Sequence, residues 1–206
     1  MASLLANHAE IRVVQTKSGN TEMTDNPNEA AGQTFLRGTP GQLNAGNFQA
    51  WDGITVNAGI FGVVLEDGHN LASAGLGVPG PFSPVGFPGT GVTFGSVPFQ
   101  PSAVNIPEGA PPSFGYVLVA EANLDTIFEA QTDNSTGIAT TPTQANVGSQ
   151  FGMSKDANNH WYIDFAKIIP GNNTVLVITQ LDPIDGSVAN ARVYFQFLKS
   201  AMQIVV

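Results

Sequence analysis

The sequence predicts an all-β fold: a β-sandwich or barrel body with a small N-terminal β subdomain, a long Gly/Pro-rich loop and an extended N-terminal arm. Short apolar runs are separated by Gly, Asn and Asp residues of the kind that close hairpins. Residues 160–165 and 192–197 alternate apolar and polar side chains with the period of a half-buried strand. At 206 residues the chain can bury a core without disulfides, and it contains no cysteine.

Residues 1–30 are predicted to form the arm. Residues 11–14 make a brief apolar run that includes Ile11 and Val13, whereas residues 15–29 are polar and rich in turn formers. A frayed terminus would give the same pattern. Because the first residues lack a basic start and a long apolar run, we expect no secretory signal.

Residues 31–112 are predicted to form the small β subdomain. Its short runs are separated by turn signals such as Asn44-Ala45-Gly46, which favour hairpins. Residues 68–107 then contain no charged group apart from a titratable His69, and they are too rich in Gly and Pro for a helix or a central strand. We interpret this loop as an interaction loop whose Phe residues contact a partner. Anchoring of the same side chains on the protein's own core is the alternative.

Residues 113–206 are predicted to form the sandwich body. We expect strands over 116–120, 126–130, 160–165, 175–178 and 192–197, and one short helix that Thr141 caps and Gly148 ends. Residues 175–178 are apolar on both faces and should form a central strand. The terminal run of Ile204, Val205 and Val206 predicts a sticky strand that pairs with a neighbouring subunit.

The charge pattern argues against two classes of partner. The formal net charge is −9, and all seven basic residues lie towards the two ends, which leaves residues 38–154 with eight carboxylates and no Lys or Arg. Because Lys and Arg neutralise the phosphates of nucleic acids, we expect no nucleic-acid partner. We also expect no membrane partner, because the acidic middle of the chain would repel anionic lipid and no segment approaches the roughly 20 apolar residues of a membrane span.

The sequence predicts no enzyme, no cofactor and no metal site. The three histidines, His8, His69 and His160, are far apart and lack ligand neighbours at metal spacing. Nucleophile-elbow, phosphate-binding and dinucleotide-binding motifs are absent. Residues 182–186 are interpreted as a turn, because a calcium loop would need further oxygen ligands at fixed spacing.

Two features leave a glycan-degrading enzyme as a minor alternative. Glu66 and Asp67, with other scattered carboxylates, could supply the carboxyl pair that glycoside hydrolysis needs. Trp51, Trp161 and Tyr162 could stack on a sugar, although buried core aromatics are the ordinary interpretation.

Two blocks of sequence carry a resemblance to a known class of protein. The first contains Gln33-Thr34-Phe35, Gly38-Thr39-Pro40, Trp51 and residues 58–62; the second contains residues 126–130, 147–153, 160–164 and 191–195. With these blocks the chain resembles the capsid cement or decoration proteins of tailed bacteriophages. The resemblance implies a non-enzymatic virion structural protein that binds the outside of the mature capsid and stabilises it by bridging neighbouring subunits of the major capsid protein. It also implies a homo-oligomer, with a trimer favoured over a dimer.

We assign the capsid and subunit contacts to segments that the body carries. The candidate interface residues are Ile11, Val13, Phe82, Phe87, Phe94, Phe99, Ile204, Val205 and Val206. The main alternative function is a virion receptor- or carbohydrate-binding protein of a fibre or tail.

Overall fold

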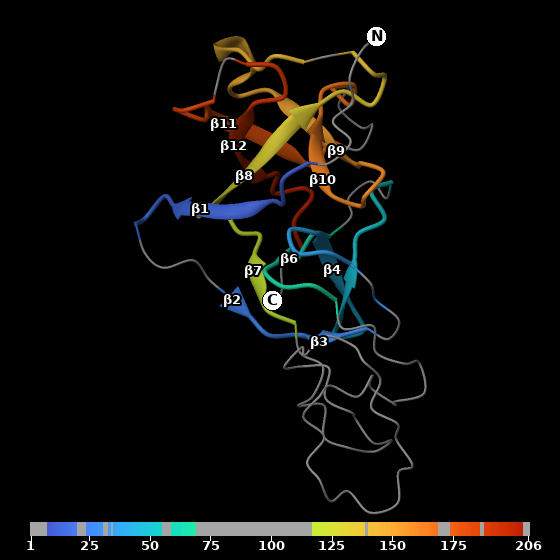
Figure 1. Cartoon of the computed structure of the whole chain (residues 1–206). Helices are drawn as coiled ribbons and strands as arrows, with labels where there is room; N and C mark the ends of the chain where they lie inside the picture. The colour runs from blue at the N-terminus through green and yellow to red at the C-terminus, as the bar shows by residue number, and fades with distance from the viewer. Residues whose placement is uncertain are drawn as a thin grey trace, which may run out of the picture.

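The computed structural model describes residues 8–19, 24–30, 33, 35–54, 59–68, 117–138, 140–168, 174–185 and 188–203 (Figure 1). Over these residues the protein is all-β, as the sequence predicts. The strands are β1 (Arg12–Thr16), β2 (Thr24–Asp25), β3 (Asn28–Glu29), β4 (Pro40–Asn44), β5 (Asn47–Ala50), β6 (Gly62–Val64), β7 (Val119–Glu121), β8 (Thr126–Asp133), β9 (Gln150–Lys155), β10 (Trp161–Asp164), β11 (Leu176–Leu181) and β12 (Arg192–Phe197). One 3-10 helix, η1 (Gln144–Asn146), lies between β8 and β9.

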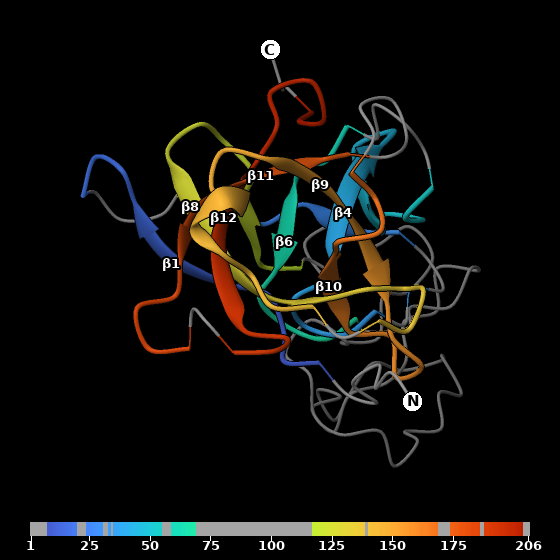
Figure 2. The same ribbon diagram turned by 90° about the horizontal axis from the view of Figure 1, so that it is seen from above.

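Five strands, β8, β10, β9, β11 and β12, close into a barrel. The order of the whole sheet is β1-β8-β10-β9-β11-β12, and a further pairing of β8 with β12 completes the ring, which Figure 2 shows from above. β1 lies outside this ring and pairs with β8. Only the β8–β10 pairing within the ring is parallel. Closure removes the open edges that a flat sheet would present, so these five strands form a rigid body.

The long strand β8 joins most of this body together. Along one edge its first half pairs with β1, from Thr126 to Glu129, and its end pairs with β10 at Thr132 and Asp133. Its other edge pairs with β12. The predicted central strand is also confirmed, because β11 pairs with both β9 and β12.

A second sheet of short strands lies below the barrel in Figure 1, in the order β2-β7-β6-β4-β5-β3. The predicted hairpin at Asn44-Ala45-Gly46 is confirmed: β4 and β5 pair antiparallel with Asn44 opposite Asn47. Ala45 and Gly46 both have positive φ, 50° and 82°, as a two-residue hairpin turn of type I′ requires.

The barrel and the small sheet share one hydrophobic core. Trp51, Ile60 and Val63 of the small-sheet region belong to the same buried cluster as barrel residues such as Phe128 and Phe195. Trp51 stacks on Trp161 with ring centroids 5.1 Å apart, so the two parts meet through their largest side chains. A second cluster, which includes Phe48, covers the opposite face of the small sheet.

The structure corrects the expected arm and the division between the two β parts. Residues 12–16 form β1 on the edge of β8, and Ile11 is only 1% exposed because it lies in the shared core. Residues 24–29 contribute β2 and β3 to the small sheet, and β7 joins that sheet although it lies in the predicted body. The expected boundaries at 30 and 112 therefore do not separate the two sheets, because each sheet draws strands from both sides of a boundary.

Gly62 in β6 provides a test of how closely the small sheet packs. A Cβ at this position would overlap the carbonyl oxygen of Ala120 and lie 2.5 Å from Val119 Cγ1. We expect Gly62→Ala to lower the free energy of unfolding by about 3 kcal/mol, because backbone atoms cannot move aside cheaply. Gly148→Ala is the comparison: φ there is +86°, with no atom within 4 Å of the new Cβ, so we expect a loss of about 1 kcal/mol. Urea denaturation measures both, and equal losses would contradict the packing argument.

Candidate functional site

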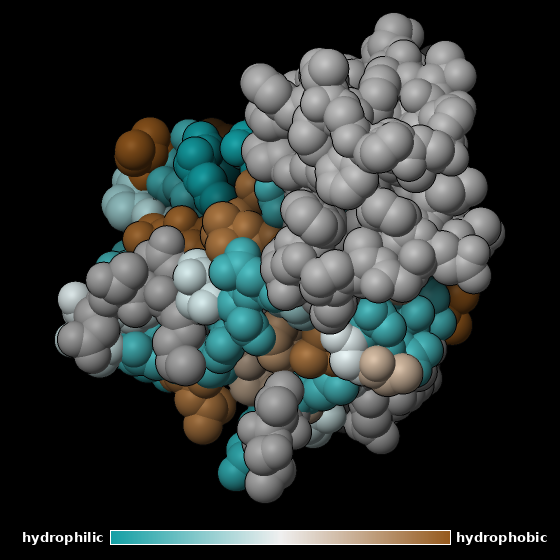
Figure 3. Space-filling model, turned by 90° about the horizontal axis from the view of Figure 1, so that it is seen from below, coloured by the Kyte–Doolittle hydropathy of each residue, from teal (hydrophilic) through white to brown (hydrophobic). Residues whose placement is uncertain are grey.

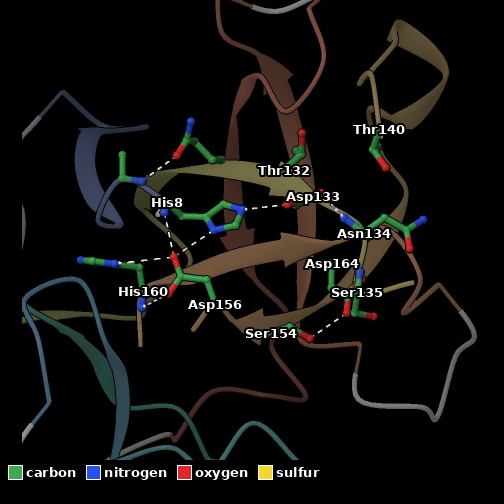
Figure 4. Close-up of polar contacts among 12 residues, drawn as sticks. His8, Thr132, Asp133, Asn134, Ser135, Thr140, Ser154, Asp156, His160 and Asp164 are labelled. Atoms are coloured by element: carbon green, nitrogen blue, oxygen red, sulfur yellow. Dashed lines mark hydrogen bonds and ion pairs between the residues drawn. The ribbon is translucent and has the colours of Figure 1, made fainter. Parts of the chain in front are cut away.

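A buried polar cluster lies on one side of the barrel, where the N-terminal segment crosses the ends of three strands (Figure 4). His8 precedes β1, Asp133 ends β8, Asp156 follows β9 and Asp164 ends β10. Asp133 and Asp164 are fully buried, and His8 is nearly so. Buried ionisable groups are rare unless they are paired or hydrogen-bonded, so this cluster is a candidate functional site.

His8 is held between two carboxylates. Its Nε2 lies 3.1 Å from Asp133 Oδ2, its Nδ1 lies 3.1 Å from Asp156 Oδ2, and its backbone N–H donates to the same Asp156 oxygen at 2.8 Å. Both ring contacts are hydrogen bonds when both nitrogens carry a proton. The ring also stacks on Tyr162, with centroids 4.4 Å apart and an interplanar angle of 18°.

Asp156 organises the turn between β9 and β10 as well as binding His8. Its Oδ1 accepts the backbone N–H groups of Asn158 and His160, at 2.8 and 2.9 Å. Burial by itself would raise the pKa of Asp156, but the hydrogen bonds from the His8 and His160 backbones and from the His8 ring outweigh it and hold the pKa below its ordinary value. Its charged form is therefore stabilised in the fold.

Asp164 is satisfied in the same way by neutral donors. Its Oδ1 accepts the backbone N–H groups of Ser135 and Ala166, at 3.1 and 2.9 Å, and its Oδ2 accepts the Ser154 hydroxyl at 2.7 Å. The neighbouring Tyr162 has a pKa raised to about 12, first by burial and then by the charge of Asp164. Its hydroxyl therefore stays protonated at neutral pH.

The cluster contains Ser, His and Asp side chains, but its geometry is that of a structural lock. A catalytic triad needs a histidine with one nitrogen on the nucleophile and the other on the orienting carboxylate. Here both His8 nitrogens face carboxylates, and the Ser154 hydroxyl donates to Asp164. What this arrangement does is fasten the N-terminal segment to the barrel.

A cavity of about 390 Å³ opens beside the cluster and contains two lysines, Lys155 and Lys167. The Lys155 ammonium lies 4.8 Å from the centroid of the Trp161 ring, and Lys167 Nζ donates to the Met153 carbonyl at 2.5 Å. Burial lowers the pKa of both lysines. Both cations are thus already engaged by groups of the barrel itself.

An apolar groove lies between the small sheet and the segment that follows β12. It has a volume of about 600 Å³. Its lining residues are Asp25, Leu43, Phe61, Glu121, Ala122, Asn123, Leu124, Lys199, Met202 and Gln203. Figure 3 shows the molecule from below, where hydrophobic residues of the described part are exposed among hydrophilic ones.

The structure places two of the predicted interface residues. Ile11 is buried in the shared core, so its assignment to a partner contact is wrong, and Val13 is partly buried against the same core. Phe82, Phe87, Phe94 and Phe99 lie outside the described residues, as do Ile204, Val205 and Val206. Their assignment to partner contacts stays a prediction.

The residues considered for other chemistry have structural contacts. Glu66 accepts the backbone N–H of Leu118, and Asp67 accepts that of Arg37. Asp182 accepts the N–H groups of Ile184 and Asp185, which confirms the predicted turn. Trp51, Trp161 and Tyr162 are buried, as the core interpretation predicts.

The sequence did not indicate the role of His8. Its two partners lie 125 and 148 residues away along the chain, so no local spacing connects them. The one available signal was Asp164, a carboxylate inside the alternating strand 160–165, whose expected outward face is in fact buried. A carboxylate in such a strand faces either solvent or a polar partner, and here the partners are the N–H groups of Ser135 and Ala166 and the Ser154 hydroxyl.

The described ranges of the chain hold no helix long and apolar enough to span a membrane, and no group of three or more His, Asp or Glu residues placed to hold a metal ion. No protein-family model matches the chain, and no curated protein or solved structure matches it.

Proposed function

We propose that the protein is a non-enzymatic structural protein of a tailed-phage virion. In this proposal it is made in the host cytoplasm, binds the outer surface of the mature capsid as a homo-oligomer, with a trimer favoured, and stabilises the shell by bridging neighbouring major capsid protein subunits. The resemblance of the two sequence blocks motivates it. The engagement of the buried carboxylates in structural hydrogen bonds is compatible with a role that needs no reaction.

One observation carries the proposal: the rigid barrel has exposed apolar side chains at both ends of β8. Ile138, Ile184 and Val188 are exposed on the two loops beyond the end of β8, and Ile184 reaches 91% exposure. These loops contact each other through a hydrogen bond from the Asn190 N–H to the Thr140 carbonyl. At the other end, just before β8, Leu124 is 59% exposed beside the apolar groove.

Two separate apolar surfaces suit a bridging protein, because a bridge must contact two neighbours at once. The eight residues of β8 separate the surfaces by roughly 25 Å at about 3.3 Å per residue. Several weak contacts on one rigid body, multiplied in an oligomer, bind tightly through effective concentration. Exposed apolar groups of this kind mark interaction surfaces when they gather on one face.

Co-sedimentation with purified, expanded capsids that lack the protein tests the proposal. We expect saturable binding at a ratio of hundreds of copies per particle, and binding to expanded shells but not to immature ones. The paired change Ile184→Ser and Val188→Ser should weaken binding without lowering the melting temperature, because both side chains are exposed. Absence of co-sedimentation with expanded shells would contradict the proposal, and a handful of copies per native particle would favour a tail or fibre protein.

A further inference from the structure

The apolar groove is a preformed feature with a fixed floor. The side-chain amide of Gln203 pairs with the backbone of Leu43 on β4: its Oε1 accepts the Leu43 N–H at 2.7 Å, and its Nε2 donates to the Leu43 carbonyl at 2.9 Å. Ile60 adds two backbone bonds, from its N–H to Ala201 and from the Gln203 N–H to its carbonyl. These contacts hold the segment after β12 against the small sheet, so the groove needs no rearrangement to open.

Two carboxylates stand at the side of this groove. Asp25 on β2 pairs with Val119 on β7, and Glu121 lies two residues further along the same strand. Because alternate residues of a strand share a face, Asp25, Val119 and Glu121 point to the same side of the sheet. Asp25 and Glu121 both line the groove, next to the exposed Leu124 and the apolar side chains of Phe61 and Met202.

The pair is electrostatically unfavourable as it stands. Burial and the nearby charge of Asp25 raise the pKa of Glu121 above its ordinary value. Lys199 also lines the groove, but among the described ion pairs none joins it to either carboxylate. Two carboxylates therefore lie in an apolar site, and a cation from outside would reduce the repulsion between their charges.

We propose that this groove binds a protein segment that presents a Lys or Arg beside an apolar side chain, with the cation between Asp25 and Glu121 and the apolar group against Leu124 and Met202. Its occupant is the capsid partner, so this identification rests on the proposed function. Charge complementarity supports it, since a chain of net charge −9 attracts basic surfaces. The arrangement of an apolar floor and a polar rim is typical of a docking site.

A binding role predicts opposite effects on stability and on affinity. Replacing Glu121 with Gln removes a like-charge contact, so Glu121→Gln should raise the melting temperature at pH 7 or leave it unchanged. The same change should weaken binding, because the cation loses one of its two carboxylates. A residue that serves only the fold would not show this opposition.

The first arm of the test measures the affinity of labelled protein for expanded capsids. We expect the double change Asp25→Asn and Glu121→Gln to weaken binding roughly tenfold, and Leu124→Ser to weaken it by a similar factor. The matched controls are Asp52→Asn and Ile54→Ser, an acidic and an exposed apolar residue outside the groove, which should bind like the wild type. Added salt should weaken the wild type more than the double variant. Wild-type affinity of the groove variants would overturn the inference while leaving the proposed function intact.

The second arm decides the matter if the wild type does not bind capsids. Acetyl-Leu-Arg-Leu-amide is titrated into the protein, and backbone amide chemical shifts are followed at Ala122, Leu124 and Gln203. Saturable shifts that are absent with acetyl-Leu-Gln-Leu-amide, and lost in the double variant, would support the groove although the capsid proposal had failed. Shifts that do not saturate, or that are equal for the two peptides, would overturn the inference.

Discussion

His8→Ala is expected to lower the free energy of unfolding by about 3–5 kcal/mol. The imidazole is fully buried and contacts carboxylate oxygens of Asp133 and Asp156 on its two sides. Removal of the imidazole leaves the two carboxylates in a low-dielectric site without the hydrogen-bond donors of its ring. The alanine also loses the stack on Tyr162.

Urea denaturation at pH 7 measures this effect, with His160→Ala as the control. His160 Nδ1 lies 3.6 Å from Asp156 Oδ2 and its side chain is partly exposed, so we expect a loss below about 1 kcal/mol there. In a double-mutant cycle, Asp133→Asn combined with His8→Ala should cost less than the sum of the single changes, because the two residues form one network. Equal losses of unfolding free energy for His8→Ala and His160→Ala would contradict the conclusion that His8 fastens the N-terminal segment to the barrel.

Acid should weaken the same lock. The folded pKa of Asp156 lies below its ordinary value, so its contribution to stability is fully present above the unfolded pKa of about 4 and is lost as the pH falls through the folded value. We expect the stability advantage of the wild type over His8→Ala to shrink in this acid range. Melting temperatures of both proteins between pH 7 and pH 3 measure it, and a constant difference would contradict the assignment.

Trp161→Ala is expected to lower the free energy of unfolding by about 3–5 kcal/mol. Trp161 is almost fully buried, stacks on Trp51 and lies under the Lys155 ammonium. It also contacts Gly53, where an added Cβ would come within 3.0 Å of the ring. The alanine would open a cavity at the place where the barrel meets the small sheet.

The conservative change Trp161→Phe separates packing from hydrogen bonding. The Trp161 Nε1 is buried with no hydrogen-bond partner among the described residues, so phenylalanine loses ring area but no hydrogen bond. We expect a loss well below that of alanine, and Ile184→Ala, on an exposed loop, should stay within about 0.5 kcal/mol of the wild type. Urea denaturation followed by near-ultraviolet circular dichroism measures all three. A phenylalanine variant as unstable as the alanine variant would contradict the packing argument.

The elements that the sequence predicted are those whose signals are local. The alternation in β10 and β12, the doubly apolar β11 and the turn residues Ala45 and Gly46 each lie within a few neighbouring residues. Where a short helix was expected, the structure has only the single 3-10 turn η1, and its N-cap is Thr143 rather than Thr141; the Asn146 Oδ1 accepts both the N–H and the hydroxyl of Thr143. Local patterns of this kind state which residues are extended and where the chain turns.

The candidate sites could not be predicted in this way. The groove is lined by side chains from β2, β4, β7 and the segments before β6 and after β12, which lie far apart in the sequence. The lock likewise joins His8 to residues more than 120 positions away. Contacts between residues so far apart in the sequence produce no pattern in the spacing of neighbouring residues, so the sequence does not indicate them.

The sequence alone therefore determined the all-β class, most strands of the body and the acidic, thiol-free surface, because period-two alternation, turn residues and net charge are properties of short segments or of composition. The tertiary structure alone decided that the N-terminal segment belongs to the barrel, that both sheets share one core, and that Asp25 and Glu121 meet in an apolar groove. These outcomes depend on which strands pair across the closed barrel, and that choice is made by packing the whole chain at once.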